Sequence, residues 1–180
     1  MNKSRILPIV IIINLLFAGC VKYSKQNKDS PLTKINEKWM DEQLVLPLSL
    51  ERLKDSLPIK NVKPYTIIAF YNGNCSACYL ELHKWKKVIP QLSKVNQVEF
   101  KFILTGPSKP FLQYNLEEID FSIDFVFYDK NDEFINHYNY MNSAGYLFSS
   151  LLVNRDNDIL SIGNPTISND DLIRFIKLME

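Results

Sequence analysis

The sequence predicts a single α/β domain with a mixed central sheet flanked by helices. Apolar runs typical of strands alternate with helical patterns, and a hairpin pattern follows in the last third of the chain. Strands that alternate with helices favour parallel pairing, whereas a hairpin adds antiparallel strands, so the sheet should be mixed. Hydrophobic residues make up 46% of the 180 residues, which is enough for one substantial core.

The clearest elements are a strand and a helix on either side of two cysteines. Residues 65–71 (YTIIAFY) form a continuous β-rich run, as in strands that are buried on both faces. After this run, apolar residues recur at steps of four and three, which predicts a helix with one buried stripe. The stripe consists of Cys78, Leu82, Trp85, Ile89 and Leu92. Pro90 predicts a kink or an early end of this helix.

The remaining elements continue the alternation. Strands are predicted at 97–104 and 121–129, a loop at 106–110, a helix at 111–119 and a hairpin at 149–163. In the less regular segment before them, 42–50 fits a short strand and 49–57 fits one or two helical turns. Ser168 is an N-cap candidate followed by acidic residues, so a helix is predicted to end the chain.

The first 20 residues resemble the signal peptide of a bacterial lipoprotein. Lys3 and Arg5 precede an apolar run at 6–18 that is short for a membrane span. The run ends in LFAGC, which is similar to a lipobox, where a small residue precedes a lipidated cysteine. The resemblance implies that residues 1–19 are removed and that acyl chains such as palmitate on Cys20 anchor the protein. The alternative is a buried anchor helix with an incidental cysteine.

The lipoprotein resemblance also implies a location and a domain organisation. The mature protein is expected in the cell envelope, anchored to a bacterial membrane, with the periplasmic side of the outer membrane favoured by Val21 after the lipidated cysteine. Residues 20–36 are polar and mostly basic, and they read as a flexible tether for a domain at 37–180. The net charge of +1, without a dense basic stripe, argues against nucleic acid as the main partner.

Cys75 and Cys78 are the cysteines that remain once Cys20 carries a lipid. In an exported chain such a pair can be oxidised and stay so, and an internal disulfide would have to join these two residues. Cys75 follows the turn formers at 72–74, with Asn74 as a candidate N-cap, and a helix start lowers the pKa of a thiol. Cys78 belongs to the buried stripe, where it would be covered and able to resolve a mixed disulfide.

A strand, a CxxC pair, a helix with an internal proline, and a terminal hairpin and helix resemble the thioredoxin fold over roughly residues 40–180. More narrowly, the chain is similar to exported, membrane-tethered thiol–disulfide oxidoreductases. The resemblance implies that Cys75 is the nucleophile and Cys78 the resolving cysteine of a redox-active disulfide. It implies that Glu81 is an auxiliary acid, that protein thiols and disulfides of the envelope are the partners, and that neither a cofactor nor a metal is bound.

The sequence departs from the pattern of this family near the cysteines. The family's cis-proline, which packs beside the disulfide, should fall near Phe148 or Ser149, so these two residues become auxiliary candidates in its place. Ala69 stands where many thioredoxins have a buried acid, and Asn74 stands where an aromatic residue is usual. The shape of the substrate groove should therefore differ from that of the family.

Two other functions remain open from the sequence alone. The pair can be a structural disulfide in a non-catalytic thioredoxin-fold lipoprotein that binds a partner. It can also bind copper(I), which accepts two thiolates and one histidine. His83 and His137 do not supply the four closely spaced ligands of a zinc site. Thiol–disulfide exchange is the leading hypothesis.

Overall fold

The computed structural model describes residues 39–40, 42–54, 63–95, 97–138 and 149–180. The predicted signal peptide, Cys20 and the tether lie outside the described residues, as does Phe148. None of the helices in these described ranges is long and apolar enough to cross a membrane.

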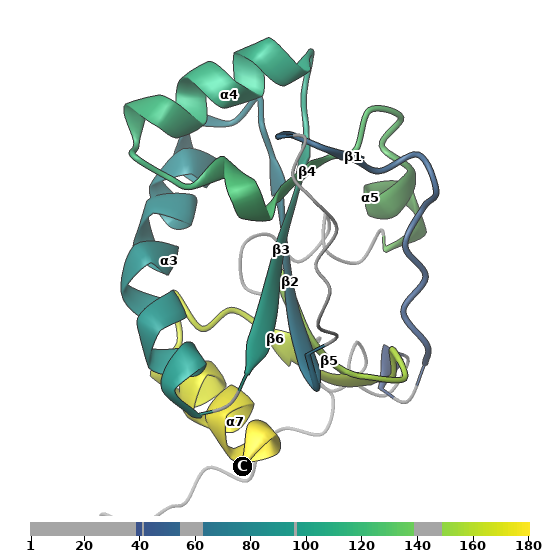
Figure 1. Cartoon of the computed structure of the whole chain (residues 1–180), viewed down its shortest axis with the longest axis vertical. Helices are drawn as coiled ribbons and strands as arrows, with labels where there is room; N and C mark the ends of the chain where they lie inside the picture. The colour runs from purple at the N-terminus through teal and green to yellow at the C-terminus, as the bar shows by residue number, and fades with distance from the viewer. Residues whose placement is uncertain (1–38, 41, 55–62, 96, 139–148) are drawn as a thin grey trace, which may run out of the picture. The chain divides into compact units, whose positions relative to one another are not determined.

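A six-stranded sheet with the order β1-β4-β3-β2-β5-β6 forms the centre of the domain (Figure 1). Its strands are β1 (Glu51–Arg52), β2 (Tyr65–Asn72), β3 (Val98–Thr105), β4 (Val126–Tyr128), β5 (Ser150–Asn154) and β6 (Ile159–Gly163). β2, β3 and β4 pair in parallel, whereas β1, β5 and β6 join the sheet antiparallel to their neighbours. The mixed sheet predicted from the sequence is confirmed.

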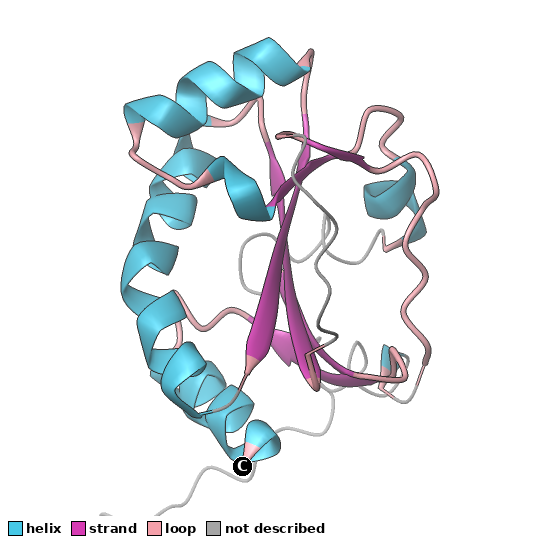
Figure 2. Cartoon of the chain, viewed as in Figure 1, coloured by secondary structure: helices cyan, strands magenta, loops and turns pink. Residues whose placement is uncertain are grey.

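Helices cover both faces of this sheet, as Figure 2 shows. They are α3 (Ser76–Val95), α4 (Lys109–Glu118), the 3-10 helix η1 (Ile123–Phe125), α5 (Glu133–His137) and α7 (Asn169–Met179). α3, α4 and α7 pack on one face, and α5 lies on the other together with the described residues before β1 (Figure 1). The predicted α/β class is therefore confirmed as well.

The larger core fills the space between the sheet and α3, α4 and α7. Phe100, Phe102 and Leu104 alternate along β3 and point into this core, whereas Ile103 between them belongs to the core on the other face. The alternation in the sequence predicted this division, because side chains along a strand point to opposite faces in turn. Trp85 of α3 is fully buried and packs edge-on against Phe102.

The smaller core lies on the face covered by α5 and includes the first described residues. Trp39 and Leu44 are buried there. The backbone N–H of Leu44 donates to Asn157 O at 2.7 Å, and that of Ile159 donates to Glu42 O at 3.0 Å. The segment before β1 is thus hydrogen-bonded to the β5–β6 hairpin and forms an integral part of the domain.

Two predictions about short elements are wrong, and one short helix was not predicted. Within the segment predicted as helical turns, Glu51–Arg52 instead forms β1, which pairs with β4. The strand predicted at 121–129 is shortened to Val126–Tyr128 because η1 precedes it. The polar–aromatic stretch after it contains α5, which no helical pattern predicted.

A buried carboxylate explains why α5 forms. Asp129 is fully buried, and its two oxygens accept the backbone N–H groups of Glu133 at 3.0 Å and of Phe134 at 2.9 Å. These amides belong to the first turn of α5, where N–H groups have no partner within the helix. Burial raises the pKa of Asp129, and the hydrogen bonds from these amides act in the opposite direction.

A kink or an early end was predicted at Pro90, and the early end is wrong because α3 continues to Val95. A proline removes the hydrogen bond to the carbonyl four residues earlier, which here belongs to Lys86. Pro90 and Lys86 are both exposed, so water can bind that carbonyl. The apolar stripe continues on the opposite, buried side, and Leu92 anchors the last turns.

Candidate dithiol site

The two cysteines follow the carboxyl end of β2, at the start of α3. The connecting turn is held by its own backbone: the N–H of Gly73 donates to Thr105 O at 2.8 Å, and that of Cys75 donates to Asn72 O at 3.1 Å. α3 begins at Ser76, so Cys75 itself occupies the position before the first helical residue that was predicted for Asn74. The Cys75 sulfur is thereby placed beside the first turn of the helix.

Gly73 allows this turn to approach two other elements. A Cβ atom at this position would lie 2.3 Å from Leu112 Cδ2 and 2.4 Å from Thr105 O, which is too close for any side chain. Leu112 belongs to α4, so the turn is packed between α4 and the end of β3. A glycine at this position therefore allows the close packing that places Cys75 just before α3.

The two cysteines differ in exposure. Cys75 is partly exposed, whereas Cys78 is 4% exposed and belongs to the buried face of α3. The backbone N–H of Cys78 donates to Cys75 O at 3.0 Å, so the pair spans a single turn. Cys75 is thus partly accessible to solvent, whereas Cys78 belongs to the core.

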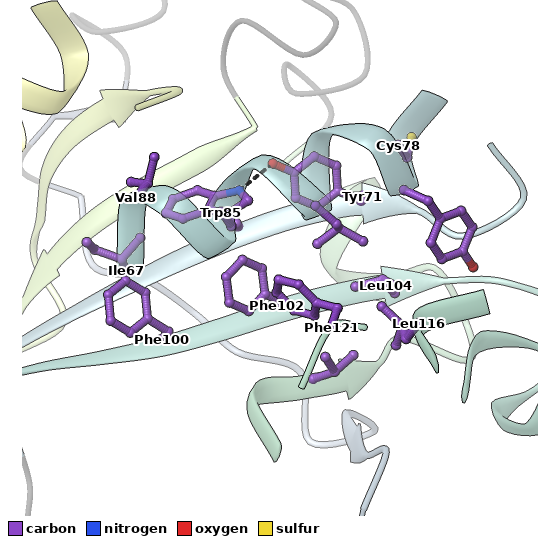
Figure 3. Close-up of a cluster of buried hydrophobic side chains, with 14 of the residues drawn as sticks. Ile67, Tyr71, Cys78, Trp85, Val88, Phe100, Phe102, Leu104, Leu116 and Phe121 are labelled. Carbon is purple, nitrogen blue, oxygen red and sulfur yellow. Dashed lines mark hydrogen bonds between the residues drawn. The ribbon is translucent and has the colours of Figure 1, made fainter. Parts of the chain in front are cut away.

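Two buried tyrosines lie near Cys78. The Tyr79 hydroxyl donates to Gly73 O at 2.9 Å, and burial, together with the charge on an ionised Cys78, raises the pKa of Tyr79 to about 12. Trp85 Nε1 donates to the Tyr71 hydroxyl at 2.7 Å (Figure 3). Burial also raises the pKa of Tyr71, against the effect of its hydrogen bonds with Ser149 and Trp85. Both phenols are therefore neutral at physiological pH, and no sequence pattern singles them out.

Glu81 lies three residues after Cys78, on the same side of α3, as helical geometry requires. Its side chain is 13% exposed and forms an ion pair with Lys84. The other carboxylate oxygen accepts a hydrogen bond from Thr166 Oγ1 at 3.1 Å. The predicted auxiliary acid thus lies between a solvent-side cation and the segment that follows β6.

Ser149, the second auxiliary candidate, lies just before β5. Its carbonyl accepts the backbone N–H of Phe70 at 2.8 Å. This bond places Ser149 beside β2, at a point two residues before the turn at 72–74. Its buried hydroxyl accepts from Asn164 Nδ2 at 2.9 Å and hydrogen-bonds to Tyr71. The serine therefore contacts the same strand that leads to the cysteines.

The two histidines lie in other surroundings. His83 Nδ1 is 3.3 Å from Ile119 O at the end of α4. His137 packs against Trp39 and Tyr138, on the α5 face of the sheet. Among the described residues, no three His, Cys, Asp or Glu side chains are grouped closely enough to hold a metal ion.

No protein-family model matches the chain, and no curated protein sequence matches it. Solved structures are similar in fold. A protein from Aquifex aeolicus assigned to electron transfer has a TM-score of 0.54 and 14% identity, with 78% of this chain and 94% of that chain covered. A thioredoxin-like protein from Parabacteroides distasonis has a TM-score of 0.53 and 11% identity, with 77% and 96% covered.

A third structure, of a protein from Bacteroides vulgatus assigned as a thiol–disulfide oxidoreductase, has a TM-score of 0.52 and 15% identity over 66% of this chain and 76% of that chain. Identities this low establish a shared fold and nothing finer. The thioredoxin-like fold predicted from the sequence is confirmed.

Proposed function

We propose that this thioredoxin-fold chain is a thiol–disulfide oxidoreductase of the bacterial cell envelope that acts through Cys75 and Cys78. The observation that carries the proposal is the placement of the pair at the start of α3, with one partly exposed and one buried sulfur. An exposed sulfur can meet a partner, and a covered sulfur one turn away can displace that partner afterwards. Dithiol exchange requires this asymmetry.

The exchange begins at Cys75. The unpaired N–H groups and the dipole of the 20-residue helix α3 favour an anionic sulfur at its start. The Cys75 thiolate attacks one sulfur of a partner disulfide and forms a mixed disulfide. The other partner sulfur leaves as a thiolate, which takes a proton from solvent.

The exchange ends at Cys78. This thiol gives up its proton and attacks Cys75 Sγ, so a Cys75–Cys78 disulfide forms and the first partner sulfur leaves as a thiolate. Two electrons have then passed from the cysteine pair to the partner, whose disulfide is reduced to a dithiol. The same steps in reverse order oxidise a partner dithiol.

Two of the solved structures of similar fold belong to proteins to which redox functions are assigned. One is of a protein assigned as a thiol–disulfide oxidoreductase, and another is of a protein assigned to electron transfer. The fold is therefore one on which redox functions occur, and the cysteines of this chain supply the specific support.

The location is a further part of the proposal and rests on the sequence. Residues 1–19 are a lipoprotein signal peptide, Cys20 carries the lipid, and residues 20–36 tether the domain at 37–180 to a membrane. Such an anchor confines the domain to the envelope surface, outside the reducing cytosol. Its partners are then protein thiols and disulfides of that compartment.

The Cys78→Ala variant is expected to accumulate mixed disulfides with envelope proteins, because the resolving step is removed while Cys75 can still attack. Non-reducing electrophoresis of envelope extracts, repeated after addition of a reductant, would reveal these adducts. A variant with alanine at both positions is the control and should trap nothing. Equal adducts in the two variants would contradict the proposal.

A further inference from the structure

Six polar side chains, each within hydrogen-bonding distance of the next, form a ring that is closed through α3. Two members belong to α3 and lie one helical turn apart. The others belong to the segment after β6, the residue before β5 and the end of β2. In order, the members are Glu81, Thr166, Asn164, Ser149, Tyr71 and Trp85. We refer to this set as the hydrogen-bonded ring. Thr166 Oγ1 has one proton and donates it either to Glu81 Oε2 at 3.1 Å or to Asn164 Oδ1 at 2.7 Å.

Asn164 is the best-held member of the ring. Its Oδ1 accepts from the Thr166 backbone N–H at 3.0 Å and lies 2.7 Å from Thr166 Oγ1. The amide oxygen of Asn164 therefore faces Thr166, and its Nδ2 is left to donate to Ser149 Oγ at 2.9 Å. Asn164 is 1% exposed, so no water molecule from bulk solvent can replace these partners easily.

The second half of the ring runs through Ser149 to Tyr71. Trp85 Nε1 is a donor only, so the Tyr71 oxygen accepts this bond. Ser149 and Tyr71 are buried, as is Trp85. Leaving any one of these buried polar atoms without its partner would cost about 1–3 kcal/mol, so each link constrains the next.

Two members of the hydrogen-bonded ring, Glu81 and Tyr71, lie near Cys78. Glu81 follows Cys78 by three residues on the same face of α3. Tyr71 belongs with Cys78 to the same core, where the two groups are close enough for the charge on Cys78 to act on the phenol. Figure 3 shows Trp85 of α3 hydrogen-bonded to Tyr71, with Cys78 at the beginning of the same helix.

We propose that Ser149 and Asn164 are positioning residues of the dithiol site, which hold the first turns of α3 against the sheet and keep Cys78 buried through the hydrogen-bonded ring. Ser149 lies near the position where the resembled family has a proline, so hydrogen bonds restrain a region that a proline ring restrains by packing in that family. The inference rests on the proposed function, because it assigns these residues to the same cysteine chemistry.

Breaking the ring is expected to change the chemistry of Cys78. Ser149 connects Asn164 to Tyr71. Without this connection, the start of α3 can move and water can reach the buried Cys78 sulfur. Hydration lowers the free-energy cost of a thiolate, so the reduced form of the pair gains stability relative to the disulfide. The pair should then become more oxidising.

Two measurements on the full chain test the role of Ser149. In a Cys75→Ser background, the Ser149→Ala substitution is expected to raise the rate of Cys78 alkylation by iodoacetamide by roughly tenfold, as the loss of one buried hydrogen bond allows. With both cysteines present, the equilibrium with glutathione is expected to shift by about tenfold, equivalent to ~30 mV towards a more oxidising pair.

Tyr71→Phe breaks the next link of the ring. If the two residues act through one chain of hydrogen bonds, the double variant Ser149→Ala, Tyr71→Phe should shift the glutathione equilibrium no further than the larger single effect. Additive shifts would mean that the two hydroxyls act independently, and that result would overturn the proposed ring.

Tyr138→Phe is the matched control. The Tyr138 hydroxyl accepts the backbone N–H of Val45 at 2.8 Å, and Tyr138 is buried in the smaller core, on the face of the sheet opposite to α3. Loss of this hydroxyl should destabilise the fold and leave both Cys78 measurements unchanged. Unchanged values in Ser149→Ala, or equal shifts in Tyr138→Phe, would overturn the inference. Both measurements use the protein without a partner, so they are independent of whether exchange in the envelope occurs.

Discussion

A chain that begins at residue 51 is expected not to fold, whereas a chain that begins at residue 37 is expected to be as stable as the full-length protein. The reason lies on the α5 face of the sheet, where Trp39 and Leu44 are buried and Leu46 and Leu50 pack against the same core. Removing them exposes apolar side chains of the two central strands. The side chains uncovered in this way are Ile68, Phe70 and Ile103.

The size of this effect follows from the area that would be lost. A large apolar side chain contributes about 1.5–3 kcal/mol when it is fully buried. Two fully and two partly buried residues thus account for on the order of 5–10 kcal/mol, which is comparable with the whole stability of a typical domain of about 5–15 kcal/mol. The backbone bonds from residues 42 and 44 to the β5–β6 hairpin would be lost as well.

Thermal unfolding followed by circular dichroism would compare the two truncated chains. A cooperative transition at the same temperature in both would show that the segment before β1 is dispensable. That result would contradict its place in the smaller core.

Trp85→Ala is expected to destabilise the domain by about 3–5 kcal/mol, the range for removing a fully buried aromatic side chain. Trp85 has no exposed surface, and its ring lies edge-on to Phe102 and Phe100 at centroid distances of 5.3 and 6.5 Å. The indole also donates to Tyr71. The substitution therefore removes packing and a buried hydrogen bond together.

Trp85→Phe separates these two contributions. A phenyl ring retains most of the contact with Phe102 but cannot donate to Tyr71, so the expected loss is about 1–3 kcal/mol. Urea unfolding of the two variants gives both free energies. If Trp85→Ala cost no more than Trp85→Phe, the packing of the indole in the larger core would not stabilise the fold as described.

The long elements could be predicted because their periodicity reports their burial directly. The steps of four and three in α3 follow the core face of a helix, and Cys78, Leu82 and Trp85 are indeed buried. The alternation in β3 likewise separates Phe102 from Ile103, which lie on opposite faces. These patterns extend over many residues, so tertiary contacts do not need to be known.

The short elements could not be predicted because contacts distant in sequence determine them. β1 has two residues, and its partners Tyr128 and Phe127 lie more than seventy positions further along the chain. α5 depends on the buried carboxylate of Asp129, which looks like an ordinary polar residue in a loop. Neither element is long enough to show a period of its own.

The candidate site likewise has one part that could be predicted from the sequence and one that could not. Cys75 and Cys78 are recognisable from their spacing and from the strand and helix around them. The hydrogen-bonded ring is not, because Ser149 and Asn164 are brought together by the pairing of β5 with β6. Tyr71 lies in an apolar run and reads as an ordinary core residue. The lack of a proline near Phe148 and Ser149 was the one signal in the sequence that pointed to this region.

The rate at which the reduced protein cleaves a soluble protein disulfide, such as those of insulin, tests the proposed chemistry most directly. The wild-type chain is expected to reduce this disulfide at a rate well above that of a buffer blank. Cys75→Ser is expected to match the blank, because serine has no thiol that could form the attacking thiolate. Equal rates for the wild-type chain and Cys75→Ser, or a wild-type rate no higher than the blank, would contradict exchange through Cys75.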